Sequence, residues 1–216
     1  MAGYFVSDKG LDMANNLDFS QRTSADAPSN TLDFSSRIAE EPTKSLMDKT
    51  EKKPKHSGTF DSHQEFMKAV FPLAQKIGEE IGLDPRLILA QSAVETGWGS
   101  KVKGNSFFGI KSHGASVPSI KFQTQEEVDG KRIKIKDSFR AYDSLEDSIK
   151  GYGKFLMNNP RYAKYLAADT LEDAAKELQK SGYATASNYG STVLSIAKGP
   201  LLTNYLKTIG YDFFFF

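Results

Sequence analysis

The sequence has 216 residues, 28 basic and 27 acidic side chains, and a formal net charge of +1. This length allows one well-buried domain with an appendage, and the balanced charge gives no electrostatic case for nucleic acid as a partner. There is no cysteine, and His56, His63 and His113 lack ligand spacing, so neither a metal nor a cofactor is expected. No apolar run has the length of a membrane span, and the N-terminus lacks the pattern of a signal peptide.

Residues 1–58 are rich in Ser, Asp, Asn, Thr and Lys and show almost no helical or strand periodicity. Such a segment cannot bury enough apolar area to offset its chain entropy, so we expect an extended or disordered tail. Within it, Leu-Asp-Phe-Ser-x-Arg occurs twice, with apolar anchors at Leu17 and Phe19 and again at Leu32 and Phe34. The repeat predicts a short docking motif for a protein partner; chance similarity in biased sequence is the alternative.

Two helices are predicted after this tail. Ser62 and Glu65 have the spacing of a capping box, and the apolar positions that follow trace one helical face as far as Gly82. Asp84 then supplies an N-cap side chain, and Pro85 occupies the first helical position, where its missing N–H costs nothing. The second helix therefore begins at residue 85.

This second helix carries one carboxyl group in an otherwise apolar setting. From Leu87 to Val94 nearly every residue is apolar or small, which predicts burial on most sides. Burial disfavours the charged form of Glu95 and raises its pKa, and a carboxyl that keeps its proton can protonate a sugar leaving group. Gly97 and Gly99 end the helix around the only tryptophan. The alternative is a solvated glutamate at a helix end.

The remaining chain alternates between strand and helix patterns. Residues 119–139 have period two with Asp129-Gly130 as a tight turn, which predicts a β-hairpin. Helices are expected after Asp143-Ser144, after Thr170, and from about 188 to 198. The predicted class is α+β, a mainly helical domain at 59–200 with one small hairpin, followed by a C-terminal extension at 201–216.

The alternation along the first hairpin strand singles out a second carboxylate. Ile120, Phe122 and Glu126 share the face expected to meet the protein, whereas Glu127 is on the opposite, solvated face. Glu126 is therefore the side chain that we expect to face a cleft between hairpin and helices. The alternative is that Glu126 only pairs with a lysine across the strand.

Several short motifs occur in a fixed order along the chain. They are Ala93-Val94-Glu95-Thr96-Gly97-Trp98-Gly99, Asn105-Ser106-Phe107-Phe108-Gly109-Ile110-Lys111, Phe139-Arg140-Ala141-Tyr142, Asn159-Pro160-Arg161-Tyr162, Gly182-Tyr183-Ala184-Thr185 and Asn188-Tyr189. With these motifs the sequence resembles the peptidoglycan glucosaminidase domain of flagellar rod-cap hydrolases, autolysins and phage lysins, glycoside hydrolase family 73. The resemblance covers roughly residues 60–200 and implies a lysozyme-like fold.

The resemblance implies cleavage of a β-1,4 glycosidic bond in peptidoglycan glycan strands. Glu95 would be the general acid, and Glu126, in the Thr-x-Glu context that the family shows before its hairpin turn, would orient water or stabilise positive charge. Attack by the acetamido group of the substrate is a third possibility. A lytic transglycosylase and a catalytically silent tail protein with the same fold remain alternatives.

Aromatic and amide side chains in the same motifs are candidates for the substrate groove, with core packing as the alternative for each aromatic ring. One departure from the family pattern lies near the end of the domain, where Ala186-Ser187 replaces the usual Asp-Pro before Asn-Tyr. The candidates are Trp98, Asn105, Phe108, Tyr142, Tyr183, Asn188 and Tyr189.

The flanking segments suggest where the enzyme acts. The repeated motif and the four phenylalanines Phe213, Phe214, Phe215 and Phe216 predict docking to a protein partner, since an apolar tail is normally avoided on a free enzyme. We therefore expect a hydrolase carried in a phage tail (the virion) that opens the cell wall locally during infection and acts in the periplasm and cell wall. A free endolysin and a flagellar-type wall hydrolase are the alternatives.

Overall fold

The computed structural model describes residues 59–112, 117–128 and 131–211, and of residues 124–128 and 131–133 it describes the backbone alone. The anchors Leu17, Phe19, Leu32 and Phe34, the turn Asp129-Gly130 and the phenylalanines at 213–216 lie outside the described residues. The elements are α1 (His63–Ile81), α2 (Pro85–Thr96), β1 (Ser119–Val128), β2 (Lys131–Arg140), α3 (Leu145–Met157), the 3₁₀ turn η2 (Pro160–Tyr162), α4 (Ala163–Leu166), α5 (Leu171–Lys180), α6 (Tyr189–Ala197) and α7 (Pro200–Thr208).

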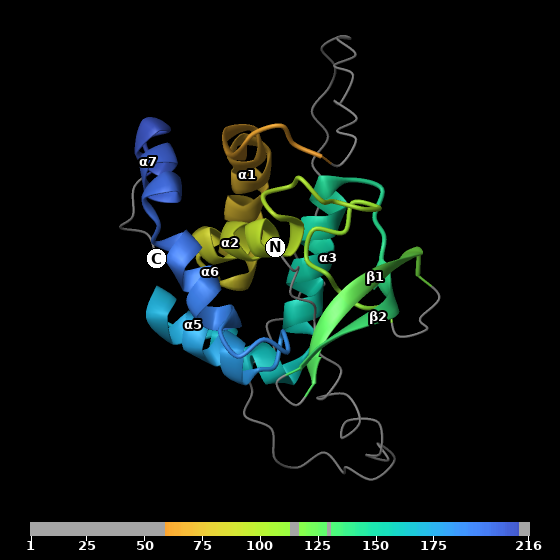
Figure 1. The fold of residues 1–216 in the computed structure, drawn as a ribbon. Helices are drawn as coiled ribbons and strands as arrows, with labels where there is room; N and C mark the ends of the chain where they lie inside the picture. The colour runs from red at the N-terminus through yellow and green to blue at the C-terminus, as the bar shows by residue number, and fades with distance from the viewer. Residues whose placement is uncertain (1–58, 113–116, 129–130, 212–216) are drawn as a thin grey trace, which may run out of the picture. The chain divides into compact units, whose positions relative to one another are not determined.

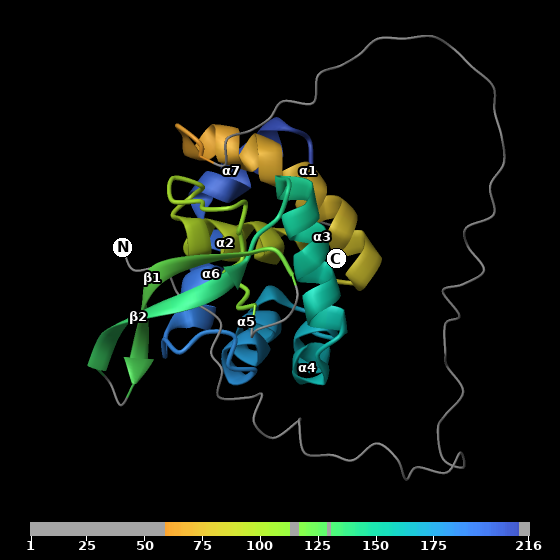
Figure 2. The same ribbon diagram turned by 90° about the vertical axis from the view of Figure 1, so that its right-hand side faces the viewer.

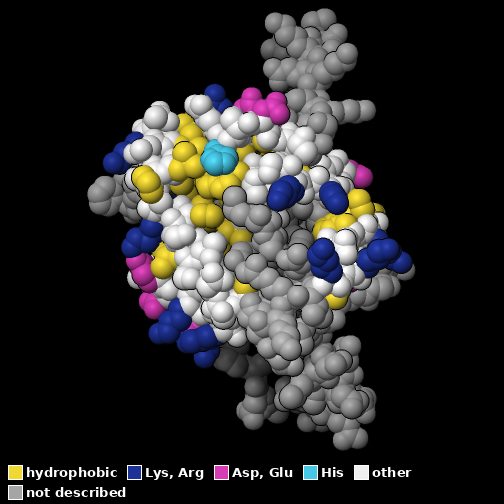
Figure 3. Space-filling model, in the orientation of Figure 1, with side chains coloured by type: hydrophobic (Ala, Val, Ile, Leu, Met, Phe, Trp, Pro, Cys, Tyr) yellow, Lys and Arg dark blue, Asp and Glu magenta, His cyan; other side chains and the backbone are white. Residues whose placement is uncertain are grey.

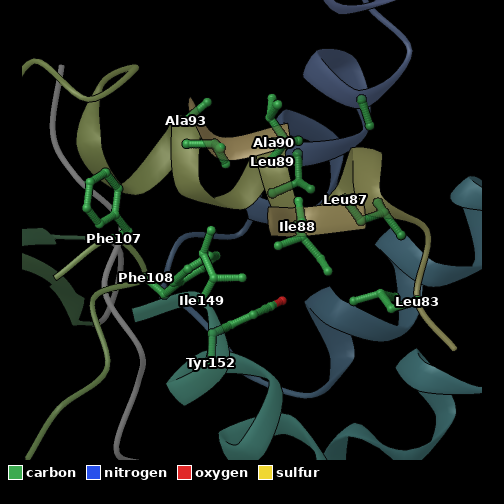
Figure 4. Close-up of a cluster of buried hydrophobic side chains, with 14 of the residues drawn as sticks. Leu83, Leu87, Ile88, Leu89, Ala90, Ala93, Phe107, Phe108, Ile149 and Tyr152 are labelled. Carbon is green, nitrogen blue, oxygen red and sulfur yellow. The ribbon is translucent and has the colours of Figure 1, made fainter. Parts of the chain in front are cut away.

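Helix α2 is the centre of the helical part, with α1 and α6 packed against it (Figures 1 and 2). Nearly every residue of α2 is buried, as its run of apolar and small side chains predicts. Figure 4 shows how Ile149 and Tyr152 of α3 and Phe108 lie close to the apolar side chains of α2. A helix surrounded in this way holds its polar side chains away from water.

The predicted helix starts and stops are confirmed for α1 and α2. The Ser62 hydroxyl accepts from the Glu65 N–H, and the Glu65 carboxylate accepts from the Asp61 N–H. The α1 helix ends at Gly82, which has φ +72°. At the start of α2, the Asp84 carboxylate accepts from the Arg86 N–H at 2.8 Å. Local sequence therefore determines both boundaries.

The hairpin is confirmed as an antiparallel pair in which Val128 lies opposite Lys131. Ile120 and Phe122 are half-buried and Lys121 is exposed, so the predicted alternation holds along the described side chains of β1. Phe122 stacks on Phe139 with ring centroids 4.3 Å apart. The hairpin projects from one side of the helical part (Figure 2).

Two features were not anticipated. The segment after α3 forms η2 and the short helix α4, whose Tyr162 and Tyr165 are fully buried. The expected C-terminal extension begins with α7, whose Leu202 and Leu206 are 0 % exposed. Tyr211 lies edge-on against Phe71 of α1 at 5.0 Å. Residues 201–211 are thus packed into the same core as the preceding helices.

Within the described residues, no helix is long and apolar enough to cross a membrane, and no three His, Cys, Asp or Glu side chains are grouped so as to hold a metal ion.

Candidate active site

Glu95 lies in the last turn of α2, directly before an abrupt helix end. Gly97, Trp98 and Gly99 all have positive φ, at 57°, 58° and 78°. The Trp98 N–H donates to the Ala93 carbonyl at 2.9 Å, and the Gly99 N–H donates to the Thr96 hydroxyl at 2.8 Å. A left-handed conformation is rare for a bulky residue such as tryptophan and is found most often where function requires a fixed turn.

Contacts of the Trp98 ring compensate for this backbone strain. The ring stacks on His63 at 4.5 Å and meets Phe66 edge-on at 5.9 Å. Hydrophobic side chains gather around a histidine on the face seen in Figure 3. Trp98 is itself half-buried, so part of its surface faces outward next to the end of α2.

Glu95 is 8 % exposed, and the two oxygens of its carboxyl group have different surroundings. Oε1 accepts a hydrogen bond from the Tyr189 hydroxyl at 2.7 Å. Oε2 is buried and has no hydrogen-bond partner among the described residues. Burial raises the pKa of Glu95 well above its ordinary value of 4.5, and the hydrogen bond from Tyr189 lowers it in part. The carboxyl is therefore neutral at a pH where an exposed glutamate is charged.

A chain of polar side chains continues inward from Tyr189. The Gln91 amide, 0 % exposed, donates from Nε2 to the Tyr189 hydroxyl at 3.4 Å. Its Oε1 accepts from the hydroxyls of Tyr152 and, at 2.8 Å, Tyr165. Burial raises the pKa of Tyr152 and of Tyr189 well above 10, so both phenols remain hydrogen-bond donors across the physiological range.

The predicted groove residues divide into two groups. Phe108, Tyr183 and Tyr189 are 0–1 % exposed: Phe108 stacks on Tyr152 at 4.1 Å, and Tyr183 stacks on Tyr189 at 5.5 Å. The Tyr183 hydroxyl donates to the Phe108 carbonyl at 2.7 Å. These rings support the site from inside, and direct contact with substrate by any of them stays a prediction.

The second group retains accessible surface. Asn188 is exposed at the start of α6, and Tyr142 is half-buried with its ring over Gly151, where an added Cβ would lie 2.5 Å from the ring. The Asn105 amide donates to the Tyr142 carbonyl at 3.0 Å, and contact of Asn105 with substrate stays a prediction. With Trp98, these residues are the predicted groove members that substrate could touch.

Glu126 lies in β1 opposite Ile133, but its side chain is outside the described residues, so its direction stays a prediction. Nearer the hairpin base, Lys111 is 4 % exposed and pairs with Asp137 of β2 at 2.9 Å. The Arg140 N–H donates to the Ile110 carbonyl at 2.8 Å. These contacts hold the end of β2 against the segment that follows α2.

Four residues of this site were not among the predicted site residues: Gln91, Tyr152, Tyr165 and Lys111. Gln91 carries a usable signal, since a polar residue four positions before Glu95 lies on the same helical face. The tyrosines on α3 and α4 carry none, because only tertiary packing brings them to Gln91. Lys111 carries no signal either, because most lysines are exposed to solvent and the sequence does not distinguish a buried lysine from these.

Solved structures of peptidoglycan hydrolases share this arrangement of helices and hairpin. The crystal structure of a peptidoglycan hydrolase mutant from Sphingomonas sp. A1 is 30 % identical, with a TM-score of 0.62, and the match covers 67 % of this chain and 99 % of that chain. Among curated relatives, Peptidoglycan hydrolase FlgJ from Pseudomonas aeruginosa is 39 % identical over 151 residues, covering 64 % of this chain and 37 % of the relative. Exo-glucosaminidase LytG from Bacillus subtilis is 28 % identical, covering 70 % and 56 %.

The glucosaminidase family model, described as mannosyl-glycoprotein endo-beta-N-acetylglucosaminidase, matches residues 71–201. The chain belongs to this glucosaminidase family. The lysozyme-like fold and the family resemblance expected from the motifs are confirmed. The chain spans between about a third and a little over half of the length of these two curated relatives.

Proposed function

We propose that this chain hydrolyses peptidoglycan at a β-1,4 glycosidic bond, as an N-acetylglucosaminidase, with Glu95 as the general acid. One observation carries the proposal: a buried carboxyl of raised pKa, with one oxygen held by Tyr189 and the other without a partner among the described residues. A neutral carboxyl in this state can protonate the leaving oxygen, and the hydrogen bond from Tyr189 then stabilises the carboxylate that remains.

The names of the relatives support the substrate class. The Pseudomonas relative is called a peptidoglycan hydrolase and the Bacillus relative an exo-glucosaminidase. Digestion of purified peptidoglycan, with product ends identified by mass spectrometry, tests the bond. Reducing N-acetylglucosamine ends are expected. Anhydro-muramyl ends would instead identify a lytic transglycosylase, and reducing N-acetylmuramic acid ends a muramidase; either result would contradict the assignment.

Glu126 is proposed as the second carboxylate, either orienting water or stabilising positive charge on the sugar ring. The alternation along the sequence of β1 supports this, because Glu126 is four positions after Phe122, whose ring stacks on the buried Phe139 of β2. Glu126→Gln should lower kcat about 10²-fold or more, whereas Glu127→Gln, on the opposite face, should leave it unchanged. Equal effects of the two substitutions would remove Glu126 from the mechanism; an active Glu126→Gln would favour attack by the substrate acetamido group.

For the biological setting we propose carriage in a phage tail, docked through the repeated Leu-Asp-Phe-Ser-x-Arg motif and the phenylalanines at 213–216. The flagellar-type alternative has its own support in the 39 % identity to the Pseudomonas relative. Removing residues 213–216 should leave hydrolysis intact and abolish incorporation into particles, measured by blotting purified particles. Unchanged incorporation would eliminate a role of this tail in docking.

A further inference from the structure

Gln91 and Glu95 are one helical turn apart on α2, and the Tyr189 hydroxyl lies between them. This hydroxyl is 3.4 Å from Gln91 Nε2 and 2.7 Å from Glu95 Oε1. An amide nitrogen can only donate, so the Tyr189 oxygen accepts from Gln91 and its own proton is directed to Glu95. The identity of the atom that Gln91 presents therefore decides the direction of the next hydrogen bond.

Two other tyrosines determine which end of the amide faces Tyr189. The hydroxyls of Tyr152 and Tyr165 both donate to Gln91 Oε1, which leaves Nε2 on the side of Tyr189. With the amide reversed, Tyr189 would donate to Gln91, and Glu95 would have to be the donor toward Tyr189. In the observed orientation each hydrogen bond of this network is donated in the direction of the Glu95 carboxyl group. That group needs donors once it has lost its proton.

We propose that Gln91 is a positioning residue, whose amide fixes the direction of the Tyr189–Glu95 hydrogen bond and so keeps the acid proton on Oε2. The inference rests on the proposed role of Glu95 as general acid. A proton on Oε1 would face the hydrogen of the Tyr189 hydroxyl, whereas Oε2 has no partner among the described residues. The proton that Glu95 keeps is therefore on the oxygen that is free to donate it.

The resulting step is balanced. The Oε2–H bond breaks and a new O–H bond forms on the glycosidic oxygen, which takes the electron pair of the C–O bond that breaks. Glu95 becomes a carboxylate whose Oε1 still accepts from Tyr189. Water supplies the hydroxyl that completes hydrolysis and the proton that restores the acid.

Four tyrosines near Glu95 in the described part of the chain stay uncharged in the relevant range. Tyr189 from α6 and Tyr183 from the segment before α6 both interact with its charge, and Tyr152 of α3 and Tyr165 of α4 reach it through Gln91. Burial raises the pKa of each of these tyrosines above its ordinary value. These tyrosines therefore add no charge of their own when the pH profiles of the Gln91 variants are compared.

The test uses Gln91→Glu and Gln91→Met in the full chain, with peptidoglycan hydrolysis followed across pH. A glutamate at 91 keeps an acceptor oxygen for Tyr152 and Tyr165, and it can donate to Tyr189 only while protonated. We expect Gln91→Glu to be active at low pH and to lose activity as its own carboxyl ionises. Methionine donates at no pH, so Gln91→Met should lower kcat about tenfold or more at every pH, with little change in KM.

Ser148→Ala is the matched control. The Ser148 hydroxyl is buried and accepts from the Phe107 N–H at 3.2 Å, so its loss weakens a core hydrogen bond that involves neither Gln91 nor Glu95. It should lower stability without moving the pH profile. If both Gln91 variants keep the wild-type kcat and pH profile, or if Gln91→Glu shows no recovery at low pH, the proposal is overturned.

A spectroscopic measurement separates this inference from the proposed function. The infrared C=O stretch of neutral Glu95, identified by its disappearance in Glu95→Gln, reports how the acid is hydrogen-bonded, whether or not the protein hydrolyses peptidoglycan. It should shift in both Gln91 variants and not in Ser148→Ala. An unshifted band would contradict the inference even in an active enzyme. If Gln91→Met does not fold, as judged by circular dichroism, the pH profile and infrared band of Gln91→Glu test the proposal.

Discussion

At the scale of single residues, burial of Glu95 lowers the stability of the folded protein and at the same time keeps the proton that the proposed catalysis uses. The residue is 8 % exposed, and burial raises its pKa well above the ordinary value. Ionisation is then more costly in the folded than in the unfolded protein. When the pKa of an acid is higher in the folded than in the unfolded state, the free energy of unfolding falls as pH rises from the unfolded pKa to the folded pKa.

We therefore predict that Glu95→Gln is more stable than the wild type at pH 7. Relief of a strained catalytic group commonly gives about 0.5–2 kcal/mol, and glutamine can still accept from Tyr189. The gain should vanish below about pH 4.5, the ordinary pKa of glutamate, where the carboxyl is neutral in both states. Thermal unfolding of both proteins across pH measures it; a gain that persists at low pH would mean that packing, rather than charge, is responsible.

Tyr189→Phe removes the hydrogen bond that lowers the pKa of Glu95. The basic limb of the pH profile should therefore move to higher pH, because the acid keeps its proton longer. The maximal rate should fall about 10- to 100-fold, since the carboxylate left after proton transfer loses a charge-assisted hydrogen bond.

Tyr183→Phe is the control for this effect. Its ring stacks on Tyr189, but its hydroxyl donates to the Phe108 carbonyl. The basic limb should stay in place in this variant. A shift of the same size in both variants would assign the effect to general loosening of the site.

At the scale of elements, the turn after α2 fixes where Glu95 points. Gly99 has φ +78°, and a Cβ at this position would lie 2.3 Å from Phe60 and 2.7 Å from Phe66. Gly82, at the end of α1, also has a positive φ, but a Cβ there meets nothing within 4 Å. Alanine substitutions at the two glycines therefore separate the cost of a left-handed backbone from the cost of steric overlap.

Gly99→Ala should therefore destabilise the protein by about 3 kcal/mol, the sum of a left-handed alanine and overpacking. Gly82→Ala should cost only about 1–2 kcal/mol, the left-handed conformation alone. Urea unfolding of both variants gives the comparison. Equal losses would show that Phe60 and Phe66 move aside easily and do not hold the turn.

The limits of prediction from sequence also lie at this scale. Helix boundaries at Ser62, Gly82 and Asp84 were predictable because capping depends on local residues. The inward face of β1 followed from alternation. The network through Gln91 could not be foreseen, since its tyrosines come from α3 and α4 and meet Gln91 only after packing. Candidates such as Phe108 were placed in the groove because an aromatic ring suits a sugar and a core equally well.

At the scale of the whole molecule, α7 belongs to the core around α2 rather than to a separate extension. Leu206 is 0 % exposed, and Tyr205 lies edge-on to Phe71 of α1 at 6.3 Å. Composition alone did not indicate this, because the helix is short and its start, Gly199-Pro200, resembles a domain boundary.

Leu206→Ala should destabilise the protein by about 2–5 kcal/mol, the usual cost of a cavity in a core. Leu201, on the same helix, is 44 % exposed, and Leu201→Ala should change stability by less than about 0.5 kcal/mol. Thermal unfolding of the two variants tests whether α7 is integral. Similarly small losses of stability in the two variants would show that residues 201–211 are an extension rather than part of the core.

The most direct test of the central claim is digestion of purified peptidoglycan by the wild type and by Glu95→Gln, compared under identical conditions. We predict that the wild type releases fragments and that Glu95→Gln, although folded and at least as stable, is slower by about 10²-fold or more. Comparable hydrolysis by the two proteins, or no hydrolysis by a folded wild type, would contradict the assignment of Glu95 as the general acid of a wall hydrolase.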